Sequence, residues 1–285
     1  MSSYNELTSN QLSIMFPRPP APPVERKPTL PLPFEIQHDV PGLPPFEVVT
    51  QTVLAMAETA DEARLVSYLQ GAAYAQLRAG PSDLLLTAID SATGDSAIHR
   101  AAAAGNIDVL DAILHSFGPN FRNVPEMERQ LWVLITHQNL AGDTALHAAA
   151  RAGSVRGVKG VYRLFHMMNC LDVDDSFYDD ETSRAESADT DYPTEAPVEY
   201  FDWSTAEDEP DAHLPALDFV CTKNRAGRDA AGEARSAGHK DLAVWLDGLI
   251  ARLDRDGMSK DEDYMRKARL TALQNHWYHG HKEEK

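Results

Sequence analysis

A glycine-led segment recurs along this 285-residue chain, and the repetition limits its possible folds more than any other feature. GDSAIHRAAAAGNID begins at Gly94, GDTALHAAARAGSV begins at Gly142, and a weaker copy runs from Asn224 to Leu246. Each copy is typical of a turn, a short alanine-rich helix, a glycine stop and a second helix. One such pair of helices cannot bury its own apolar face, so the copies must stack on one another.

Residues at fixed places in the copies have assignable structural roles. The turn glycines Gly94, Gly142 and Gly227 suit a backbone with positive φ. Ser96 and Thr144 carry hydroxyls at the place where a side chain caps the following helix. The first helix has almost no side-chain bulk, which lets neighbouring copies approach closely, and the second helix supplies the larger apolar residues.

These copies resemble the ankyrin repeat. Residues 142–147, GDTALH, are close to the signature of that family, and residues 94–99 differ from it conservatively. The resemblance implies an all-α fold, a short curved solenoid that binds other proteins and has no catalytic site of its own. It also implies that two histidines hydrogen-bond across their turns. The structural signature residues are then Gly94, His99, Gly142, Thr144, His147 and Gly227.

The spacing of the copies predicts two insertions. Gly94 and Gly142 are 48 residues apart, and Gly142 and Gly227 are 85 apart, against about 33 for a simple repeat of this type. The excess of about 15 and about 52 residues is expected to project from one edge of the stack. The predicted domain organisation has three parts: a disordered Pro-rich arm over 1–45, a repeat domain over 46–253, and a C-terminal helix and tail over 258–285. Within the repeat domain, capping helices are expected at 47–80 and repeats near 90–115, 138–168 and 222–250. A disordered acidic insertion is expected at 172–212.

Helices are also expected outside the copies. Apolar spacing predicts helices over 47–56 and 61–77, which form a degenerate unit at the start of the stack. Ser259 and Glu262 have the spacing of a capping box, which predicts a C-terminal helix that runs to about Trp277. This helix either seals the last repeat or lies exposed.

The negative charge of the chain is concentrated in one insertion. The formal net charge is −18, and residues 172–212 contribute −15 of it, with 16 acidic residues and one basic residue. The same segment has aromatic residues without helical or strand periodicity, and its charge density predicts a flexible loop. The candidate partner-binding residues are Asp174, Asp175, Asp179, Asp180, Glu181, Tyr200, Trp203, Glu207 and Asp208.

The N-terminal arm is rich in proline, with 11 prolines between Pro17 and Pro45. Proline fixes φ and removes an amide donor, so the arm should be extended. It contains PxxP spacings but lacks the flanking basic residue that orients an SH3 ligand. The alternative to an SH3 ligand is a spacer or an arm that wraps around the surface of the protein.

Several functional classes are disfavoured. No nucleophile elbow, phosphate-binding glycine loop, metal motif or cofactor motif is present, so no catalytic, metal or cofactor residue is expected. No apolar run approaches the ~20 residues that span a bilayer, and no basic-then-apolar leader begins the chain. The acidic balance disfavours direct nucleic-acid binding. We expect a monomer in the cytoplasm, the nucleus or both.

The function expected from these features is protein binding. Carboxylates and aromatic rings suit a basic partner, because they replace its phosphate contacts and stack on its guanidinium groups. Residues 90–249, with SAGHK at 236–240, are similar to a small fungal ankyrin-repeat chaperone that escorts a small-subunit ribosomal protein. This favours an adaptor or escort of a basic ribosomal or other nucleic-acid-binding protein. The alternatives are a regulatory scaffold that recognises a non-basic partner through the repeats and the Pro-rich arm, or an acidic segment that only solvates the insertion.

Overall fold

The computed structural model describes residues 46–75, 80–118, 125–169, 213–254 and 256–273. These residues form twelve α-helices and no β-strand, which confirms the all-α class. The Pro-rich arm and the acidic segment lie outside the described residues. In chain order the helices are α2 (Phe46–Thr59), α3 (Glu62–Ala75), α4 (Pro81–Thr87), α5 (Ala97–Ala104), α6 (Ile107–His115), α7 (Pro125–Ile135), α8 (Ala145–Ala152), α9 (Val155–Asn169), α11 (Leu214–Val220), α12 (Ala230–Ala237), α13 (Lys240–Leu253) and α14 (Glu262–Leu273).

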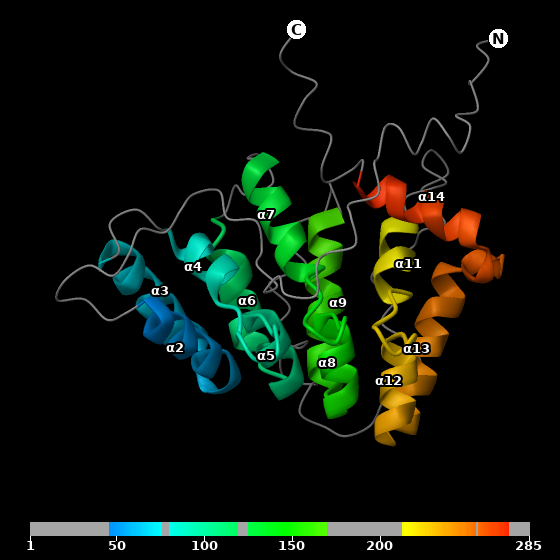
Figure 1. The fold of residues 1–285 in the computed structure, drawn as a ribbon, viewed down its shortest axis with the longest axis horizontal. Coiled ribbons are helices and arrows are strands. Elements are labelled where there is room, and N and C mark those ends of the chain that lie inside the picture. Colours follow the sequence, from blue (N-terminus) through cyan, green and yellow to red (C-terminus); the bar gives the residue numbers. More distant parts are fainter. Residues whose placement is uncertain (1–45, 76–79, 119–124, 170–212, 255, 274–285) are drawn as a thin grey trace, which may run out of the picture.

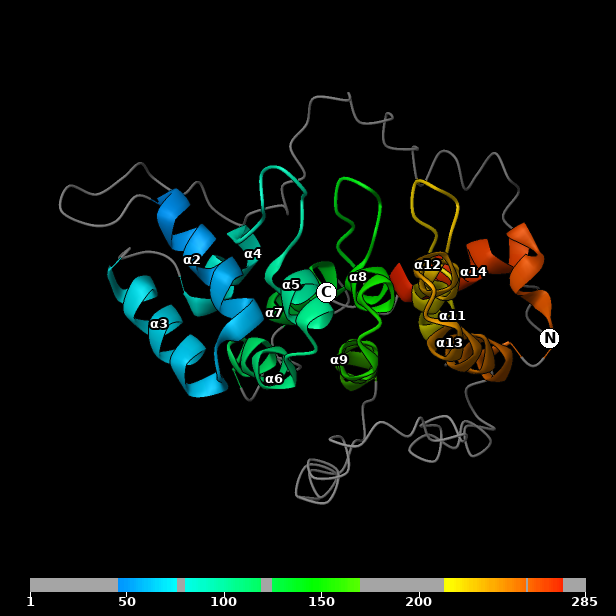
Figure 2. The same cartoon turned by 90° about the horizontal axis from the view of Figure 1, so that it is seen from below.

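Four antiparallel helix pairs stand side by side and form a short solenoid (Figure 1). The inner row consists of α2, α5, α8 and α12, and the outer row consists of α3, α6, α9 and α13, as Figure 2 shows from below. Three loops project together from the side of the inner row (Figure 2). We call α5 with α6 repeat 1, α8 with α9 repeat 2, and α12 with α13 repeat 3.

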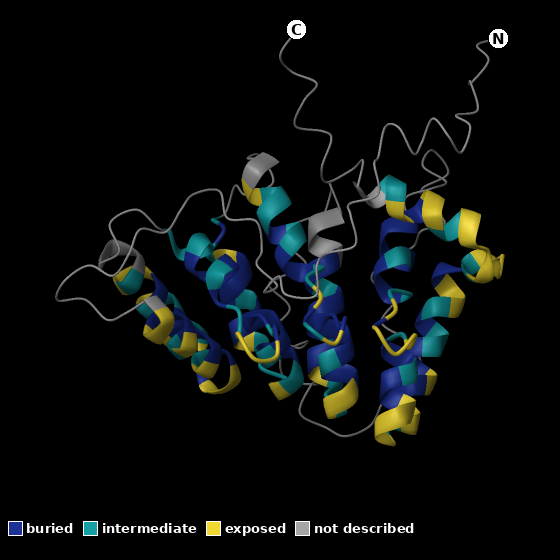
Figure 3. Cartoon of the chain, in the orientation of Figure 1, coloured by how far each residue is buried: buried dark blue, intermediate teal, exposed yellow. Residues whose placement is uncertain are grey.

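Small side chains let the inner helices pack closely. Ala101 and Ala102 of α5 and Ala149 and Ala150 of α8 are fully buried, and none of these side chains is larger than a methyl group. The outer helices supply the bulk of the core through larger residues such as Leu110. Buried positions accordingly line the faces between adjacent pairs in Figure 3.

The pair α2 and α3 lies in the region where the apolar pattern predicts two helices. Val53 of α2 and Leu65 and Leu69 of α3 are fully buried. This pair therefore covers the N-terminal side of repeat 1.

Each repeat is preceded by a further short helix: α4, α7 and α11, respectively. The sequence analysis missed α4, and it assigned the regions of α7 and α11 to insertions at the edge. Leu131 and Leu134 of α7 and Leu217 and Phe219 of α11 are buried instead. The expectation that the whole excess length projects is therefore wrong for these two helices, because their apolar residues complete the core.

Helix α9 is longer than α6 and reaches between these added helices (Figure 1). Phe165 near its C-terminal end stacks on Phe219 of α11, with ring centroids 4.3 Å apart and planes 3° from parallel. This aromatic contact joins the outer row to the helix that precedes repeat 3.

The C-terminal helix α14 packs across α11. Ala268 is fully buried, Arg269 lies 3.4 Å from the carboxylate of Asp218, and His213 Nε2 lies 3.2 Å from the Tyr264 hydroxyl. Helix α14 is therefore not wholly exposed, but its contacts are with α11, the helix that precedes repeat 3.

The predicted capping box at the start of α14 is wrong. Ser259 lies in a short 3-10 turn, η6 (Met258–Lys260), where its N–H donates to Asp254. The carboxylate of Asp261 accepts from the N–H groups of Asp263 and Tyr264 instead. An ionised carboxylate one residue before the helix supplies the stronger acceptor. Trp277 lies outside the described residues.

Candidate interaction surface

Three turn loops lie on the side of the stack that faces away from the outer helices. They are finger 1 (residues 90–96), finger 2 (139–143) and finger 3 (224–228). An amide or carboxylate side chain closes each loop: Asn139 Oδ1 accepts from the N–H of Ala141 and Asp143, at 2.9 Å each. Asn224 does the same in finger 3, and Asp90 accepts from Ala92 and Thr93 in finger 1.

The signature glycines close the turns of these fingers, because the N–H groups of Gly94, Gly142 and Gly227 donate to the carbonyl oxygens of Asp90, Asn139 and Asn224. Gly94, Gly142 and Gly227 have φ values of 77°, 78° and 74°, a region that other residues rarely adopt. Gly142 has a second reason to lack a side chain, because an added Cβ would lie 2.8 Å from the backbone nitrogen of Arg225 in finger 3. The glycine thus serves both the turn and the contact between fingers.

Neighbouring fingers are joined by hydrogen bonds. Leu140 N donates to Thr93 O and Arg225 N donates to Ala141 O, each at 2.9 Å. The amides of the finger asparagines add a second link, from Asn139 to Asp95 and from Asn224 to Asp143, each at 2.7 Å. The fingers therefore form one connected ledge.

The signature histidines join each repeat to the next finger. His99 and His147 are almost fully buried. The Nε2 of His99 lies 2.9 Å from the carbonyl oxygen of Asp143, and that of His147 lies 3.0 Å from the carbonyl oxygen of Arg228. A carbonyl accepts only, so Nε2 carries the proton.

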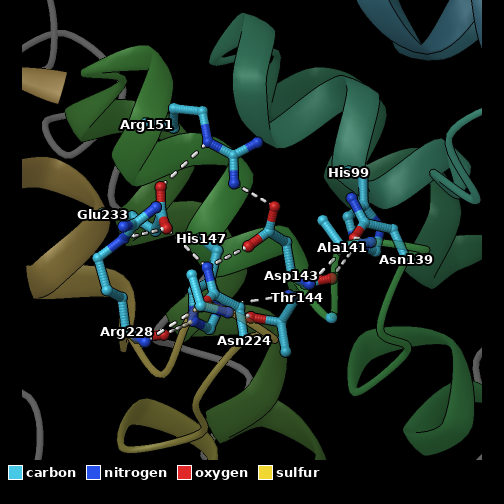
Figure 4. Close-up of polar contacts among 12 residues, drawn as sticks. His99, Asn139, Ala141, Asp143, Thr144, His147, Arg151, Asn224, Arg228 and Glu233 are labelled. Carbon is cyan, nitrogen blue, oxygen red and sulfur yellow. Dashed lines mark hydrogen bonds and ion pairs between the residues drawn. The ribbon is translucent and has the colours of Figure 1, made fainter. Parts of the chain in front are cut away.

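The other ring nitrogen faces the cap of its own helix. His147 Nδ1 accepts from Thr144 N at 3.2 Å and lies 2.8 Å from the Thr144 hydroxyl, and His99 is placed in the same way beside Ser96. Figure 4 shows the Thr144 and His147 side chains together. Ser96 and Thr144 are thus the caps of α5 and α8, but their hydroxyls contact a histidine.

Both histidines are held in the neutral form. Burial lowers the pKa of His99 from 6.5 to about 4, and it also lowers the pKa of His147. Protonation at Nδ1 would place an N–H against the N–H of the cap residue. These histidines therefore act as fixed structural connectors at neutral pH.

The sequence analysis did not identify His137, which completes the contact between repeats 1 and 2. Its Nε2 lies 2.9 Å from Gly94 O, so it donates back to finger 1 while His99 donates forward to finger 2. The two rings meet edge to face at 5.6 Å, and burial lowers the pKa of His137. His137 lies just before finger 2 in the sequence, and this position could have indicated its role, although the ankyrin resemblance does not mark it.

Repeat 3 departs from this pattern. Counted from the helix cap, Gly232 stands where repeats 1 and 2 have the signature histidine, and Arg228 stands where they have Asp95 and Asp143. Glu233 is buried and accepts from Asn224 at 2.6 Å and from Arg228 at 2.7 Å. Its carboxylate also pairs with Arg151 at 3.2 Å, as Figure 4 shows.

These donors keep Glu233 ionised. Burial acts to raise the pKa of its carboxyl group, but the hydrogen bonds from Arg228, Asn224 and Arg151 outweigh burial and hold the pKa below its ordinary value. Repeat 3 has neither a histidine to donate to a further finger nor an aspartate to accept from one. Its polar groups turn back toward repeat 2, which suits the last unit of a stack.

A groove of about 820 Å³ lies between the fingers and the inner helices of repeats 1 and 2. Its floor consists of small side chains from α5, α8 and the fingers. These alanines are Ala92, Ala103, Ala104, Ala141, Ala148 and Ala152. The groove is therefore shallow, and polar side chains stand at its ends.

At one end of the groove, Arg100 is surrounded by carboxylates. Its guanidinium lies 2.8 Å from Glu58, 2.7 Å from Asp90 and 3.7 Å from Asp95. Burial acts to raise the pKa of Asp90, but hydrogen bonds from Ala92, Thr93 and Arg100 hold it below the ordinary value. Three carboxylates against one guanidinium leave a surplus of negative charge at this end.

At the other end, the charge of Arg151 is matched. Its guanidinium pairs with Asp143, which is fully buried, and with Glu233. Arg228 adds a second positive charge beside Glu233. Two guanidinium groups therefore face two carboxylates, and this end has no surplus.

The structure places the signature residues in the fingers and inner helices, and it brings none of the predicted partner-binding residues into view. Gly94, His99, Gly142, Thr144, His147 and Gly227 all lie among the described residues. The acidic and aromatic candidates all lie outside them: Asp174, Asp175, Asp179, Asp180, Glu181, Tyr200, Trp203, Glu207 and Asp208.

A family model described as ankyrin repeats (many copies) matches residues 98–159, which include α6, α7 and α8, all of α5 but its first residue, and the start of α9. No curated protein and no solved structure gives a significant match to the chain. Within the described ranges, no helix has the length and apolar character to cross a bilayer, and no three His, Cys, Asp or Glu side chains gather as metal ligands.

Proposed function

The chain is an ankyrin-repeat protein, and we propose that it is an adaptor or escort that shields a basic client protein. Ankyrin repeats are interaction modules that stack into extended binding surfaces. The client class in this proposal is a ribosomal or other nucleic-acid-binding protein. Its binding surface is the finger side of the stack together with the acidic segment 172–212.

The distribution of charge carries this proposal. The segment 172–212 contributes −15 to the net charge, and the other 244 residues together contribute −3. Its tyrosine and tryptophan residues add faces on which guanidinium groups stack. A polybasic client would lose its exposure to nucleic acid when these carboxylates occupy its phosphate-binding residues.

Affinity purification from cells, followed by mass spectrometry, tests the proposal. The full chain is compared with a chain lacking 172–212 and with a chain in which the 16 acidic residues of that segment become Asn or Gln. Basic proteins should be lost from both variants, and a purified basic client should bind the full chain less tightly as salt rises. Equal recovery of the same clients by all three chains would contradict the proposal.

A regulatory scaffold is the second candidate, and the proline-rich arm favours it. Eleven prolines between Pro17 and Pro45 give an extended segment that a groove-bearing partner can recognise. In this case, removal of residues 1–45 should abolish partner recovery, and removal of 172–212 should leave it unchanged. The same purification therefore separates the two candidates.

The proposal includes a monomeric, non-catalytic protein of the cytoplasm, the nucleus or both. Repeat 3 supports the monomer, because Gly232 and Arg228 replace the residues that would join a further repeat end to end. Sedimentation of the purified chain tests the oligomeric state, and a concentration-dependent increase in mass would contradict it.

A further inference from the structure

We propose that the groove between the fingers and α5 and α8 binds an extended segment of a basic partner, with one Lys or Arg of that segment at the Arg100 end. This inference rests on the proposed function and assigns a specific subsite within it. It concerns described residues only and makes no use of the acidic segment.

The sign of the charge at the groove selects a cation. Glu58, Asp90 and Asp95 surround Arg100 and exceed it in charge. The side chain of Glu58 is 42% exposed, so one of these carboxylates remains open to a second cation. The Arg151 end has no surplus of either sign, which leaves the Arg100 end as the charged subsite.

The floor of the groove selects an extended chain. Ala104 and Ala152 are exposed, and Ala103 and Ala148 are half-buried, so the floor offers methyl groups and little relief. A helix laid on it would meet few large anchors, whereas an extended segment can place small side chains against each methyl group. Adjacent helix pairs are ~10 Å apart and an extended chain rises ~3.3 Å per residue, so about three residues cross one repeat.

Binding of labelled peptides to the full chain tests the inference by fluorescence anisotropy. The probe is a peptide of about twelve residues that alternates lysine and alanine, which is long enough to cross three repeats. A peptide in which glutamate replaces each lysine is the control. The lysine peptide should bind, and the glutamate peptide should not.

Variants of exposed groove residues locate the binding. Ala152→Trp and Ala104→Trp fill the floor and should each weaken lysine-peptide binding about tenfold, because the bulk blocks the groove without entering the core. Ala251→Trp, at an exposed position of α13 outside the groove, is the matched control and should have no effect. Circular dichroism melts establish that each variant is folded.

A second pair of variants tests the charge. Glu58→Gln should weaken lysine-peptide binding about threefold, a size typical of an exposed ion pair. Asp247→Asn, which removes an acidic residue from α13, should leave binding unchanged. The same variants in a chain lacking 172–212 show how much binding the groove contributes alone.

The outcomes distinguish this inference from the proposed function. If removal of 172–212 abolishes peptide binding and the groove variants have no effect in the full chain, the proposed function stands and the groove subsite is wrong. If the groove variants weaken binding and the deletion does not, the subsite stands and the role of the acidic segment is wrong. Binding of neither peptide would overturn the groove subsite.

Discussion

The interface between repeats 1 and 2 and the interface between repeats 2 and 3 are built from different materials. The outer helices of repeats 2 and 3 begin directly after Ser154 and His239. Three and six residues after this point, repeat 2 has Gly157 and Gly160, whereas repeat 3 has Leu242 and Trp245. A Cβ at Gly157 would overlap the carbonyl oxygen of Ala102, and one at Gly160 would lie 2.6 Å from Ile107 Cδ1. Close backbone approach thus forms part of the first interface, whereas large buried side chains stand at the matching positions of repeat 3.

The polar contacts differ in the same way. The first interface has two neutral histidines that donate in opposite directions, His99 to Asp143 O and His137 to Gly94 O. The second also has two histidines, His147 to Arg228 O and His239 to Arg151 O, and it adds a network of charges on Arg151, Glu233 and Arg228. Two interfaces with one sequence signature therefore differ in balance. The first has close backbone contact, hydrogen bonds and one ion pair, between Arg163 of α9 and Asp111 of α6, whereas the second has a linked network of ion pairs around Glu233.

The largest effect is expected from Gly157→Ala, which breaks the close approach at the first interface. The added methyl group meets the backbone of α5, which cannot move without disturbing the inner row. We expect a loss of more than about 3 kcal/mol in the free energy of unfolding, measured by urea denaturation. Stability equal to that of the natural chain would show that α9 does not pack against α5 as described.

Acidification should weaken the first interface next. His99 has a pKa of about 4 in the folded protein and 6.5 when exposed, so the unfolded chain binds more protons between these values. Stability from this group is complete above pH ~6.5 and falls by about 3 kcal/mol as the pH drops toward 4. Urea denaturation at a series of pH values measures the slope.

The histidine pair gives this slope a matched control. His137→Thr places the residue that repeat 3 has at the same position, Thr222, in the first interface. The variant should have a shallower pH dependence, because one histidine with a lowered pKa is removed. A flat profile in the natural chain between pH 7 and 5 would contradict the neutral, buried state of both rings.

Arg151→Ala should have a smaller effect, and on the second interface. It leaves the buried carboxylates of Asp143 and Glu233 without their shared partner. The expected loss is about 2 kcal/mol, which is below the full cost of breaking a buried pair because the guanidinium is nearly half exposed. Arg235→Ala, which breaks an exposed pair with Asp247, should cost less than about 0.5 kcal/mol.

Hydrogen exchange shows which interface Arg151→Ala destabilises. Arg151→Ala should increase exchange in α12 and finger 3 more than in α5. Equal increases in every helix would show that the charge network does not belong to one interface.

A small effect of opposite sign is expected from Gly248→Ala. This glycine lies within α13, and an added Cβ has no atom within 4 Å. Alanine should therefore raise stability by about 0.5–1 kcal/mol through helix propensity alone. A thermal melt compared with that of Gly157→Ala checks that the cost there comes from contact and not from glycine replacement in general.

Local patterns were sufficient to predict the repeated helices, because turn glycines, caps and alanine-rich segments act over a few residues. The fold class and the ankyrin resemblance followed from Gly94 to His99 and Gly142 to His147. Helix α4 was missed because Pro81–Thr87 is too short for apolar periodicity to emerge. The cap of α14 was misassigned because Asp261 and Ser259 both precede the helix, and only the backbone geometry distinguishes them.

The candidate site was predictable only in part. The alanines of the groove floor follow from the repeats, but the surplus charge around Arg100 does not. Glu58 lies 42 residues before Arg100, and Arg151 lies 82 residues before Glu233. No pattern of short period relates such residues.

The sequence by itself thus determines each repeating unit, because turns, caps and side-chain size specify a helix pair within about thirty residues. The partners of its charged and histidine side chains depend on which unit stacks on which. Contacts between residues of different units arise only when the units pack, because ion pairs and ring contacts depend on distance in space and not on separation along the chain.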